Sequence, residues 1–396
     1  MQFDWDDHQE SLYLSFRELG ERTHRTDMAE RDLQAAFNHE GWKLCADNGV
    51  LRLLLPAAYG GCEHDPVTYA HAMEGLGYGC EDNGLLLSLS AHTLAVEVPI
   101  LRFGDEPQRS KYLPGLGAGR LIGANAMTEP ATGSDALALS TVAVKDGSSY
   151  RLTGRKICVT NAPIADVFIV YATVNPELGF SGVTAFLVES GDTGVTIKNG
   201  PAKMGMRTSP WGELELDECR ATASRRLGRE RQGSAIFAQA MAWERALLLS
   251  PWLGVMDRVI DQTISYSRQR RQFGKHIGHF QSVSNRIVDM RVTLEASRLL
   301  TYRAAYALRS HATGIMPEIS KLHASESAVA ILAGALQTYG ALGYTEAGHL
   351  ERHMRDVIGL TISSGTADMQ RVIVSSKLGI AWPETHSSGQ GHDESS

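Results

Sequence analysis

The sequence predicts an α+β protein in which a helical domain, a middle antiparallel β domain and a second helical domain follow one another. Three observations predict this order. Apolar residues recur at helical spacing over residues 1–124, short β-rich runs alternate with turns over 125–233, and helical spacing returns over 234–381. A chain of 396 residues is long enough for two or three such packed units.

The first domain is predicted to be a set of short helices. In the stretch SLYLSFRELG, Leu12, Phe16 and Leu19 are spaced to share one helix face. Breaks rich in glycine and proline, PAAYGG at 56–61 and LPGLGAG at 113–119, separate the helical segments.

The middle domain is predicted to be a small antiparallel sheet. The runs ADVFIVYATV at 165–174 and VTAFLVE at 183–189 are rich in β-branched and aromatic residues. The run WGELELDE at 211–218 alternates polar and apolar residues, as a strand with one buried face does.

The C-terminal domain is predicted to contain long helices over 234–270, 281–312 and 320–339. Pro251 is expected to kink the first of them, because proline lacks the N–H that a helix interior requires. The tail over 382–396 is of low complexity and is predicted to be disordered.

Composition excludes several classes of function. The net charge of −7 and the lack of a long basic stripe argue against nucleic acid as a partner. The five cysteines are scattered without a C-x-x-C pair, which predicts no disulfide framework, no metal site and a reducing cytoplasm. The acidic N-terminus resembles no signal peptide, and no apolar run is expected to span a membrane.

Common catalytic motifs are missing. The chain has no Walker loop, no H-E-x-x-H and no G-x-S-x-G. GLGYG at 75–79 and GLGAG at 115–119 lack the full G-x-G-x-x-G pattern and follow no predicted strand, which disfavours a dinucleotide-binding fold.

Three stretches suggest a ligand site, although each also has a purely structural interpretation. AMTEPATGSD at 126–135 offers backbone N–H groups and small hydroxyls, or is an interdomain loop. KICVTNAP at 156–163 ends a strand in Thr160 and Asn161, or is an ordinary turn. SRQRRQFGKHIGHFQ at 267–281 carries cations suited to a pyrophosphate, or is a solvated helix end.

These stretches occur in one order, TEPxxGSD, KxxxTN, RxQFGK, MRD at 354–356 and SGTxDMQ at 364–370. In this order they resemble the acyl-CoA dehydrogenase family of FAD flavoproteins. The resemblance implies the fold of that family, with an N-terminal helical domain, a middle β domain and a C-terminal four-helix bundle. It also implies an FAD held between the β domain and the C-terminal helices.

The resemblance implies roles for individual residues. Those matched to the flavin and the thioester are Met127, Thr128, Gly133, Ser134, Cys158, Thr160, Thr366 and Asp368. Those matched to the pyrophosphate and adenosine of an FAD in a neighbouring subunit are Arg270, Gln272, Phe273, Gln281, Gln337 and Gly340. A site shared in this way implies an oligomer, and the family is typically tetrameric. The family usually carries an aromatic residue at the Cys158 position and a glycine at the Ala341 position.

The catalytic base is expected at an unusual position. The common members of the family place a glutamate just before the G-T of the last motif, where this chain has Ser364. Members of the isovaleryl-CoA type place it on the long helix after the β domain, and the matching residue here is Glu244 in AMAWERALLLS. Glu244 is therefore the expected base, although a glutamate in a helix usually forms a salt bridge. Its apolar neighbours would raise its pKa, and Ser364 would contribute its backbone N–H to the thioester oxygen.

Other stretches are similar to a narrower group, the L-prolyl-carrier-protein dehydrogenases of pyrrole-forming pathways. They are TNAPIADVFIVYATVNPELGFSGVTAFLVE at 160–189, FQSVSNRIVDM at 280–290, and the W-E pair at 243–244. This similarity implies an L-prolyl substrate on the phosphopantetheine arm of a peptidyl carrier protein, and a pyrrole-2-carbonyl product. Ser134, Trp243, Arg245 and Ser364 are the expected substrate contacts.

Partners and rival functions remain open from the sequence. An acidic carrier protein would need a basic surface, for which the arginines of 224–231 are candidates, or these residues are a solvated loop. The electron acceptor would be oxygen or an electron-transfer flavoprotein. The rival functions are a dehydrogenase of free acyl-CoA thioesters, a flavin monooxygenase on the same fold, and a flavin-free binding protein.

Overall fold

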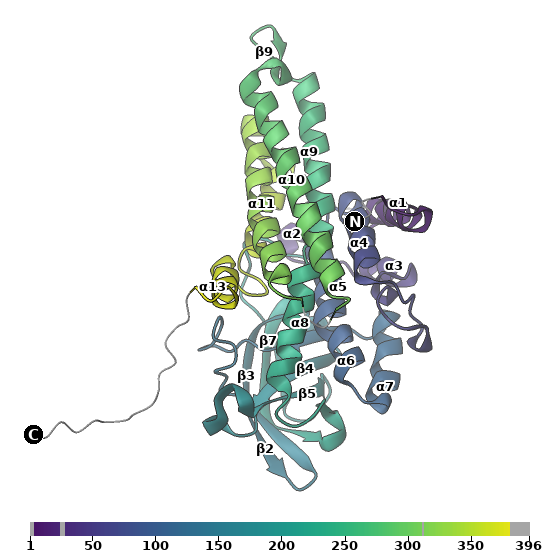
Figure 1. Ribbon diagram of the computed structural model, residues 1–396, viewed down its shortest axis with the longest axis vertical. Helices are drawn as coiled ribbons and strands as arrows, with labels where there is room; N and C mark the ends of the chain where they lie inside the picture. Colours follow the sequence, from purple (N-terminus) through teal and green to yellow (C-terminus); the bar gives the residue numbers. More distant parts are fainter. Residues whose placement is uncertain (1–3, 24–27, 311–312, 381–396) are drawn as a thin grey trace, which may run out of the picture.

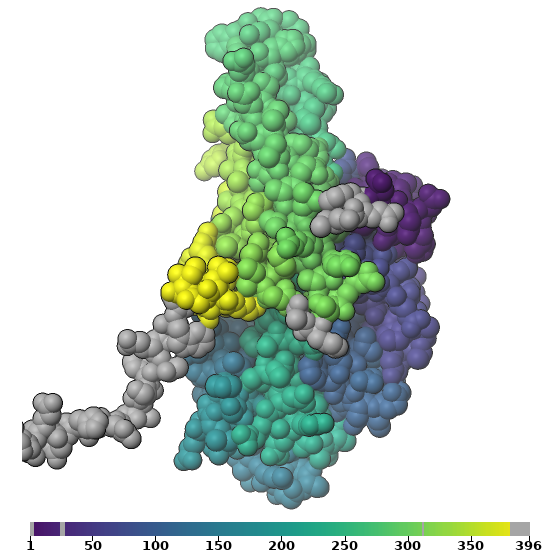
Figure 2. Space-filling model, viewed as in Figure 1, coloured from purple at the N-terminus to yellow at the C-terminus, as the bar shows by residue number. Residues whose placement is uncertain are grey.

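The computed structural model describes residues 4–23, 28–310 and 313–380. Figure 1 shows an elongated molecule with a tall helical bundle at one end, the sheet at the other, and the N-terminal helices beside their junction. The space-filling view in Figure 2 shows the end of the bundle standing clear of the rest of the molecule. The predicted order of helices, sheet and helices is confirmed. The tail over 382–396 lies outside the described residues.

The N-terminal domain is helical, as predicted. Its helices are α1 (Asp7–Arg22), α2 (Met28–Gln34), α3 (His39–Asp47), α4 (Pro66–Gly79), α5 (Asn83–His92), α6 (Val98–Phe103) and α7 (Glu106–Gly117). Helix α1 begins at a capping box in which Asp6 accepts from the backbone N–H of Gln9, and it buries Phe16 and Leu19. The three glycines of GLGYG lie within α4, and those of GLGAG lie within or just after α7, so neither stretch follows a strand.

One apolar stretch of this domain corrects an expectation from the sequence. Helices α5 and α6, joined by a π-helical turn at Thr93–Glu97, form a continuous stretch that is long and apolar enough to cross a membrane. Its mean hydropathy is 1.6, and 83% of the apolar window is buried inside the protein. The stretch is apolar because the π-helical turn lies in the core, against helix α8 (Gly233–Leu247) and strand β1 (Gly123–Ala126).

The middle domain holds one large sheet. Its other strands are β2 (Val142–Asp146), β3 (Ser149–Thr160), β4 (Val167–Thr173), β5 (Val183–Glu189), β6 (Val195–Asn199), β7 (Trp211–Thr222) and β8 (Arg226–Leu227). The prediction of a wholly antiparallel sheet is wrong in one respect, because β1 and β2 both pair with β4 in parallel. No α-helix forms either crossover. Between β1 and β4 the chain passes through β2 and β3, and between β2 and β4 it passes through β3 and a short 3-10 turn at Ala162–Ile164.

Strand β4 is buried on both faces. Val167, Ile169 and Tyr171 face the cluster that α6, α7 and α8 cover, while Phe168 and Val170 face the other side of the sheet. This explains why its sequence is almost wholly apolar.

The C-terminal domain contains the long helices α8, α9 (Ser250–Gln269), α10 (Gln281–Ala307) and α11 (Met316–Tyr339), followed by α12 (Leu350–Leu360) and α13 (Ala367–Lys377). A short hairpin, β9 (Arg271–Gln272) and β10 (Lys275–His276), caps the far end of the bundle (Figure 1). The expected kink at Pro251 is instead a break, since α8 ends at Leu247 and Pro251 lies in the first turn of α9, where proline is tolerated.

Candidate active site

Glu244 lies near the C-terminal end of α8, on a face turned into the protein. Only 7% of the residue is exposed. Burial raises the pKa of its carboxyl to about 7, although a hydrogen bond from Ser364 and the charge of Arg245 oppose the rise. A carboxyl with such a pKa can accept a proton near neutral pH.

Ser364 lies in contact with Glu244, the predicted base. The hydroxyl of Ser364 donates to a carboxylate oxygen of Glu244 at 3.2 Å, although 120 residues separate them in the chain. The two positions that the sequence identified therefore face one point in the fold.

The loop that carries Ser364 is held in a strained conformation. Ser364 has φ of 51° and Gly365 has φ of 85°, so two successive residues adopt left-handed backbone. Lys321 and Gln370 both donate to the carbonyl oxygen of Gly365, at 2.8 and 2.9 Å. Thr366 caps α13 by accepting from the N–H of Met369. These contacts fix the loop over Glu244.

The neighbours of Glu244 on α8 have separate partners. Arg245 forms an ion pair with Glu318 at 3.1 Å, and its Nε lies 3.4 Å from the carbonyl oxygen of Ser364. The guanidinium of Arg102 lies over the buried ring of Trp243, 4.7 Å from the ring centroid. Arg245 thus positions the loop, and Trp243 packs in the core of the helical domains.

A buried ion pair joins the first two motifs. Lys156 donates to Glu129 at 2.7 Å and to the carbonyl oxygen of Met127 at 3.2 Å, and both side chains are about fully buried. Burial would raise the pKa of Glu129, but bonds from Lys156, Ser140 and Thr141 outweigh it and lower the pKa to about 2. Both stretches were predicted to contribute to a ligand site, but this ion pair was not predicted. Its signal in the sequence is the one glutamate of the first motif, Glu129, and the one basic residue of the second, Lys156.

The Met127–Ser134 stretch and the end of strand β3 lie side by side. Together they form a surface, called the ledge below, on which a flavin would rest. The N–H of Ile157 donates to the carbonyl oxygen of Thr128, which brings strand β3 beside the Met127–Ser134 stretch. A register shift between Lys156 and Val159 bulges β3 and leaves Cys158 exposed, with φ of 55°.

The ledge fits a ligand with hydrogen-bonding groups. Gly133 and Ser134 are exposed, and a Cβ on Gly133 would meet no atom within 4 Å. Oγ1 of Thr132, the residue before Gly133, is buried without a hydrogen-bond partner among the described residues, as is Oδ1 of Asn125 on β1. Unpaired buried groups of this kind call for a partner from outside the chain.

The remaining predicted cofactor residues do not join this site. Arg270, Gln272, Phe273 and Gln281 lie at the hairpin end of the bundle, far along the molecule from the sheet (Figure 1). Phe273 is 93% exposed. Gln337 and Gly340, at the end of α11, are exposed as well. Asp368 is also exposed, but it lies in the first turn of α13, directly after the Ser364 loop.

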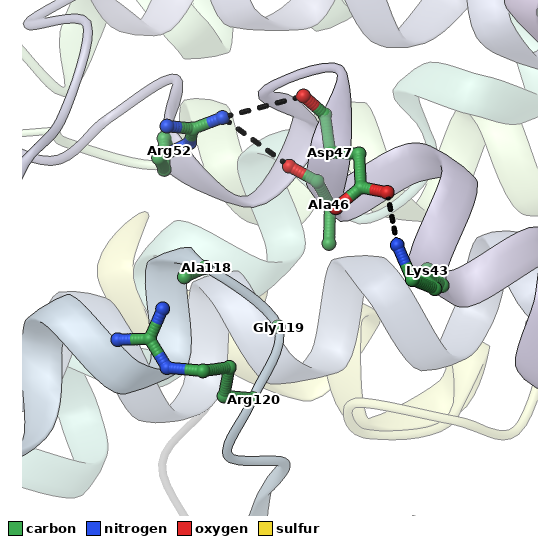
Figure 3. A pocket seen from close by; sticks show the side chains of 7 residues that line it. All are labelled: Lys43, Ala46, Asp47, Arg52, Ala118, Gly119 and Arg120. Carbon is green, nitrogen blue, oxygen red and sulfur yellow. Dashed lines mark hydrogen bonds and ion pairs between the residues drawn. The ribbon is translucent and has the colours of Figure 1, made fainter.

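Two basic surfaces lie apart from Glu244. In the 224–231 segment Arg225 pairs with Glu189 and Asp192, so only Arg229 and Arg231 are exposed there. A hollow of about 580 Å³ lies between α3 and the turn after α7. Figure 3 shows the residues that line it. Its cationic side chains are Lys43, Arg52 and Arg120, of which Lys43 pairs with Asp47.

The fold and the buried carboxyl define a class of protein, and the chain belongs to the acyl-CoA dehydrogenase family. Residues 6–120, 124–219 and 231–379 match the N-terminal, middle and C-terminal domains of acyl-CoA dehydrogenase, respectively. Within that family it is similar to an L-prolyl-[peptidyl-carrier protein] dehydrogenase of Pseudomonas fluorescens, with 42% identity over 86% of this chain and 90% of the relative.

Solved structures agree with this placement. The prolyl acyl carrier protein oxidase AnaB is 40% identical, with a TM-score of 0.93 over 95% of this chain and all of AnaB. PigA, solved with FAD and proline, is 38% identical, with a TM-score of 0.93 over 96% of this chain and all of PigA.

Proposed function

We propose that this protein is an FAD-dependent dehydrogenase that oxidises an L-prolyl thioester on a peptidyl carrier protein to a pyrrole-2-carbonyl thioester. The observation that carries the proposal is the buried Glu244, with its pKa raised to about 7, in contact with Ser364. The likeness to prolyl-carrier-protein enzymes over nearly the whole chain supports the substrate.

In the proposed reaction Glu244 removes the proton on the substrate α-carbon. The α-proton of a thioester is weakly acidic, so the base needs a pKa near the working pH. Burial raises the pKa of Glu244 toward that range. The backbone N–H of Ser364 would bind the thioester oxygen, where negative charge develops as the proton leaves. Trp243 would close one side of the pocket beside the small ring, and Arg245 would hold the Ser364 loop in place.

The residues of the ledge would hold the FAD. Met127, Thr128, Gly133, Ser134, Cys158 and Thr160 would line the flavin, together with Thr366 and Asp368. The FAD would supply the acceptor for the hydride that leaves the β-carbon. Conversion of a pyrrolidine ring to a pyrrole removes four electrons and four hydrogens, so a second two-electron oxidation and a tautomerisation would follow the first.

A second copy of the chain would complete the cofactor site. The hairpin residues Arg270, Gln272 and Phe273, with Gln281, would contact the pyrophosphate and adenosine of a neighbour's FAD, as would Gln337 and Gly340. Their exposure at the end of the bundle supports this assignment. We propose an oligomer on this basis, and a homotetramer from the resemblance to the family. The scattered cysteines support a place in the reducing cytoplasm.

The carrier protein would dock through exposed arginines. Arg229 and Arg231 are the exposed arginines of the 224–231 segment, although Nε of Arg231 donates to the carbonyl oxygen of Ser181. The hollow of Lys43, Arg52 and Arg120 is the rival surface. The electron acceptor would be oxygen or an electron-transfer flavoprotein. The name of AnaB, an oxidase, favours oxygen in that relative.

A dehydrogenase of free acyl-CoA thioesters is the second candidate, because the fold family carries that activity in its name. A flavin monooxygenase would not need the buried base at Glu244. The test is anaerobic mixing of the flavin-loaded protein with L-prolyl carrier protein and, separately, with short acyl-CoA thioesters. Bleaching of the flavin by the prolyl carrier alone is expected. Bleaching by acyl-CoA alone would refute the prolyl substrate.

A further inference from the structure

Tyr171 carries a buried polar group that the proposed reaction leaves unused. The residue lies on β4, is 0% exposed, and its hydroxyl has no hydrogen-bond partner among the described residues. Tyrosine hydroxyls that are buried usually find a partner, so this one calls for an explanation.

Tyr171 lies on the side of the sheet that faces the candidate base. Its ring makes an edge-on contact with Phe237 of α8, with centroids 5.6 Å apart. Phe237 precedes Glu244 by seven residues, which is close to two helical turns, so both lie on the face of α8 that turns toward β4. The charge of Glu244 acts on the Tyr171 hydroxyl: burial first, and then this charge, raise the pKa of Tyr171, so the hydroxyl stays protonated.

The side chain of Tyr171 packs in an apolar cluster. Tyr171 belongs to a cluster with Leu139 and Met127, and the loop residue Leu137 packs against it. This cluster adjoins the Met127–Ser134 stretch where the flavin and thioester are proposed to lie. Tyr171 therefore reaches the neighbourhood of Glu244 from the sheet, whereas Ser364 reaches it from the C-terminal loop.

We propose that the Tyr171 hydroxyl accepts a hydrogen bond from the ring N–H of the substrate and so selects a cyclic amino-acyl thioester over a carbocyclic or fatty one. The inference rests on the proposed function. A prolyl thioester presents two polar positions to the pocket, the thioester oxygen and the ring nitrogen. The backbone N–H of Ser364 is assigned to the oxygen, which leaves the ring nitrogen for the unpaired hydroxyl. A neutral tyrosine hydroxyl has lone pairs for this bond.

The experiment compares two substrates on one carrier protein: L-proline, and cyclopentanecarboxylate, which has the same ring without the nitrogen. Wild-type protein should reduce its flavin at least about 10-fold faster with the prolyl carrier, since a site built to bind an N–H discriminates against an analogue lacking it. Tyr171→Phe should lose about 10-fold to 100-fold in kcat/KM with the prolyl carrier and change little with the analogue.

Tyr112→Phe is the matched control. Tyr112 lies in the same apolar cluster, but its hydroxyl bonds to Glu189, so its loss should leave the substrate ratio unchanged. Equal losses of Tyr171→Phe on both substrates, or no loss on either, would overturn the assignment. So would a wild-type protein that reduces its flavin equally fast with both. If wild type does not react with the prolyl carrier, both this inference and the proposed function fail. If it does react and only the Tyr171 result is negative, the proposed function stands.

Discussion

The two ends of the molecule treat their functional residues in opposite ways. Around Glu244 the chain completes its own site: the carboxyl is buried, Ser364 contacts it, and Lys321 and Gln370 hold the loop. At the hairpin end the predicted cofactor residues stand in solvent, with Phe273 93% exposed. Under the proposed function, one chain would supply the proton chemistry alone, whereas binding of the cofactor's distal end would need a second chain.

The largest expected effect comes from removing the proposed catalytic base in the buried site. Glu244→Gln should reduce the rate of flavin reduction by about 10²-fold to 10⁴-fold, because a general base contributes that much. Stopped-flow absorbance under anaerobic conditions measures the rate. The variant should keep its bound flavin and its melting temperature. A loss below 10-fold would place the base elsewhere.

Loss of the buried Lys156–Glu129 ion pair should have the next largest effect, on the stability of the fold. Lys156→Met leaves Glu129 buried without its cation, which should lower the free energy of unfolding by about 3–5 kcal/mol. Urea unfolding measures this change. Arg155→Met is the matched control: its neighbouring side chain is half exposed and pairs with Glu213 on the surface, so the loss should stay below about 1 kcal/mol. Equal losses would mean that burial of the pair contributes nothing.

Burial of Glu244 also predicts how stability depends on pH. The folded protein holds this proton up to a pH of about 7, while the unfolded chain releases it near 4.5. Stability should therefore fall as the pH rises from about 4.5 through 7, by up to about 3 kcal/mol from this group at 1.36 kcal/mol per pKa unit. Urea unfolding at pH 5 and pH 8 measures the loss. Glu244→Gln cannot ionise, so its stability should fall less between pH 5 and pH 8 than that of the wild type. If the free energy of unfolding changes equally with pH in both proteins, Glu244 does not have a raised pKa.

A smaller effect is expected at the exposed end. Phe273→Asp should weaken the association of subunits and raise the dissociation constant of FAD by roughly 10-fold, because an apolar contact becomes a charged one. Sedimentation velocity and flavin titration measure the two quantities. Phe180→Asp, on another surface phenylalanine with 64% exposure, should change neither. A tetramer that survives Phe273→Asp with full flavin would show that the hairpin makes no such contact.

The smallest expected effect is a change in the pKa of Glu244 when Ser364 loses its hydroxyl. Ser364→Ala removes the hydroxyl that stabilises the Glu244 carboxylate, so the pKa of Glu244 should rise further, by less than about one unit. The pH at which flavin reduction reaches half its maximum should move upward by the same amount. Ser363→Ala removes the neighbouring hydroxyl, which has no partner among the described residues, and should leave the profile in place. A profile that moves downward would mean that the hydroxyl acts on the protonated form.

Much of this architecture could be predicted because its signals are local. Helical spacing predicted the two helical domains, and the shared motif order predicted where Glu244 and Ser364 would meet. The parallel pairing of β1 with β4 could not be predicted, since strand direction depends on which distant strands meet. The break before Pro251 was missed because a proline inside a helix and one at its first turn look alike in a sequence. The unpaired hydroxyl of Tyr171 is invisible until its surroundings are known.

The place of Glu244 on a helix has a consequence for how such a site can diversify. A base on a loop ties two tasks to the same few residues, since any change that reshapes the pocket also moves the base. Here the carboxyl is anchored in α8, and the contact opposite it comes from the Ser364 loop. The side chains of that loop can change over generations while its held backbone and the carboxyl on α8 keep their places. The base on α8 can therefore stay in place while the residues that select the substrate change.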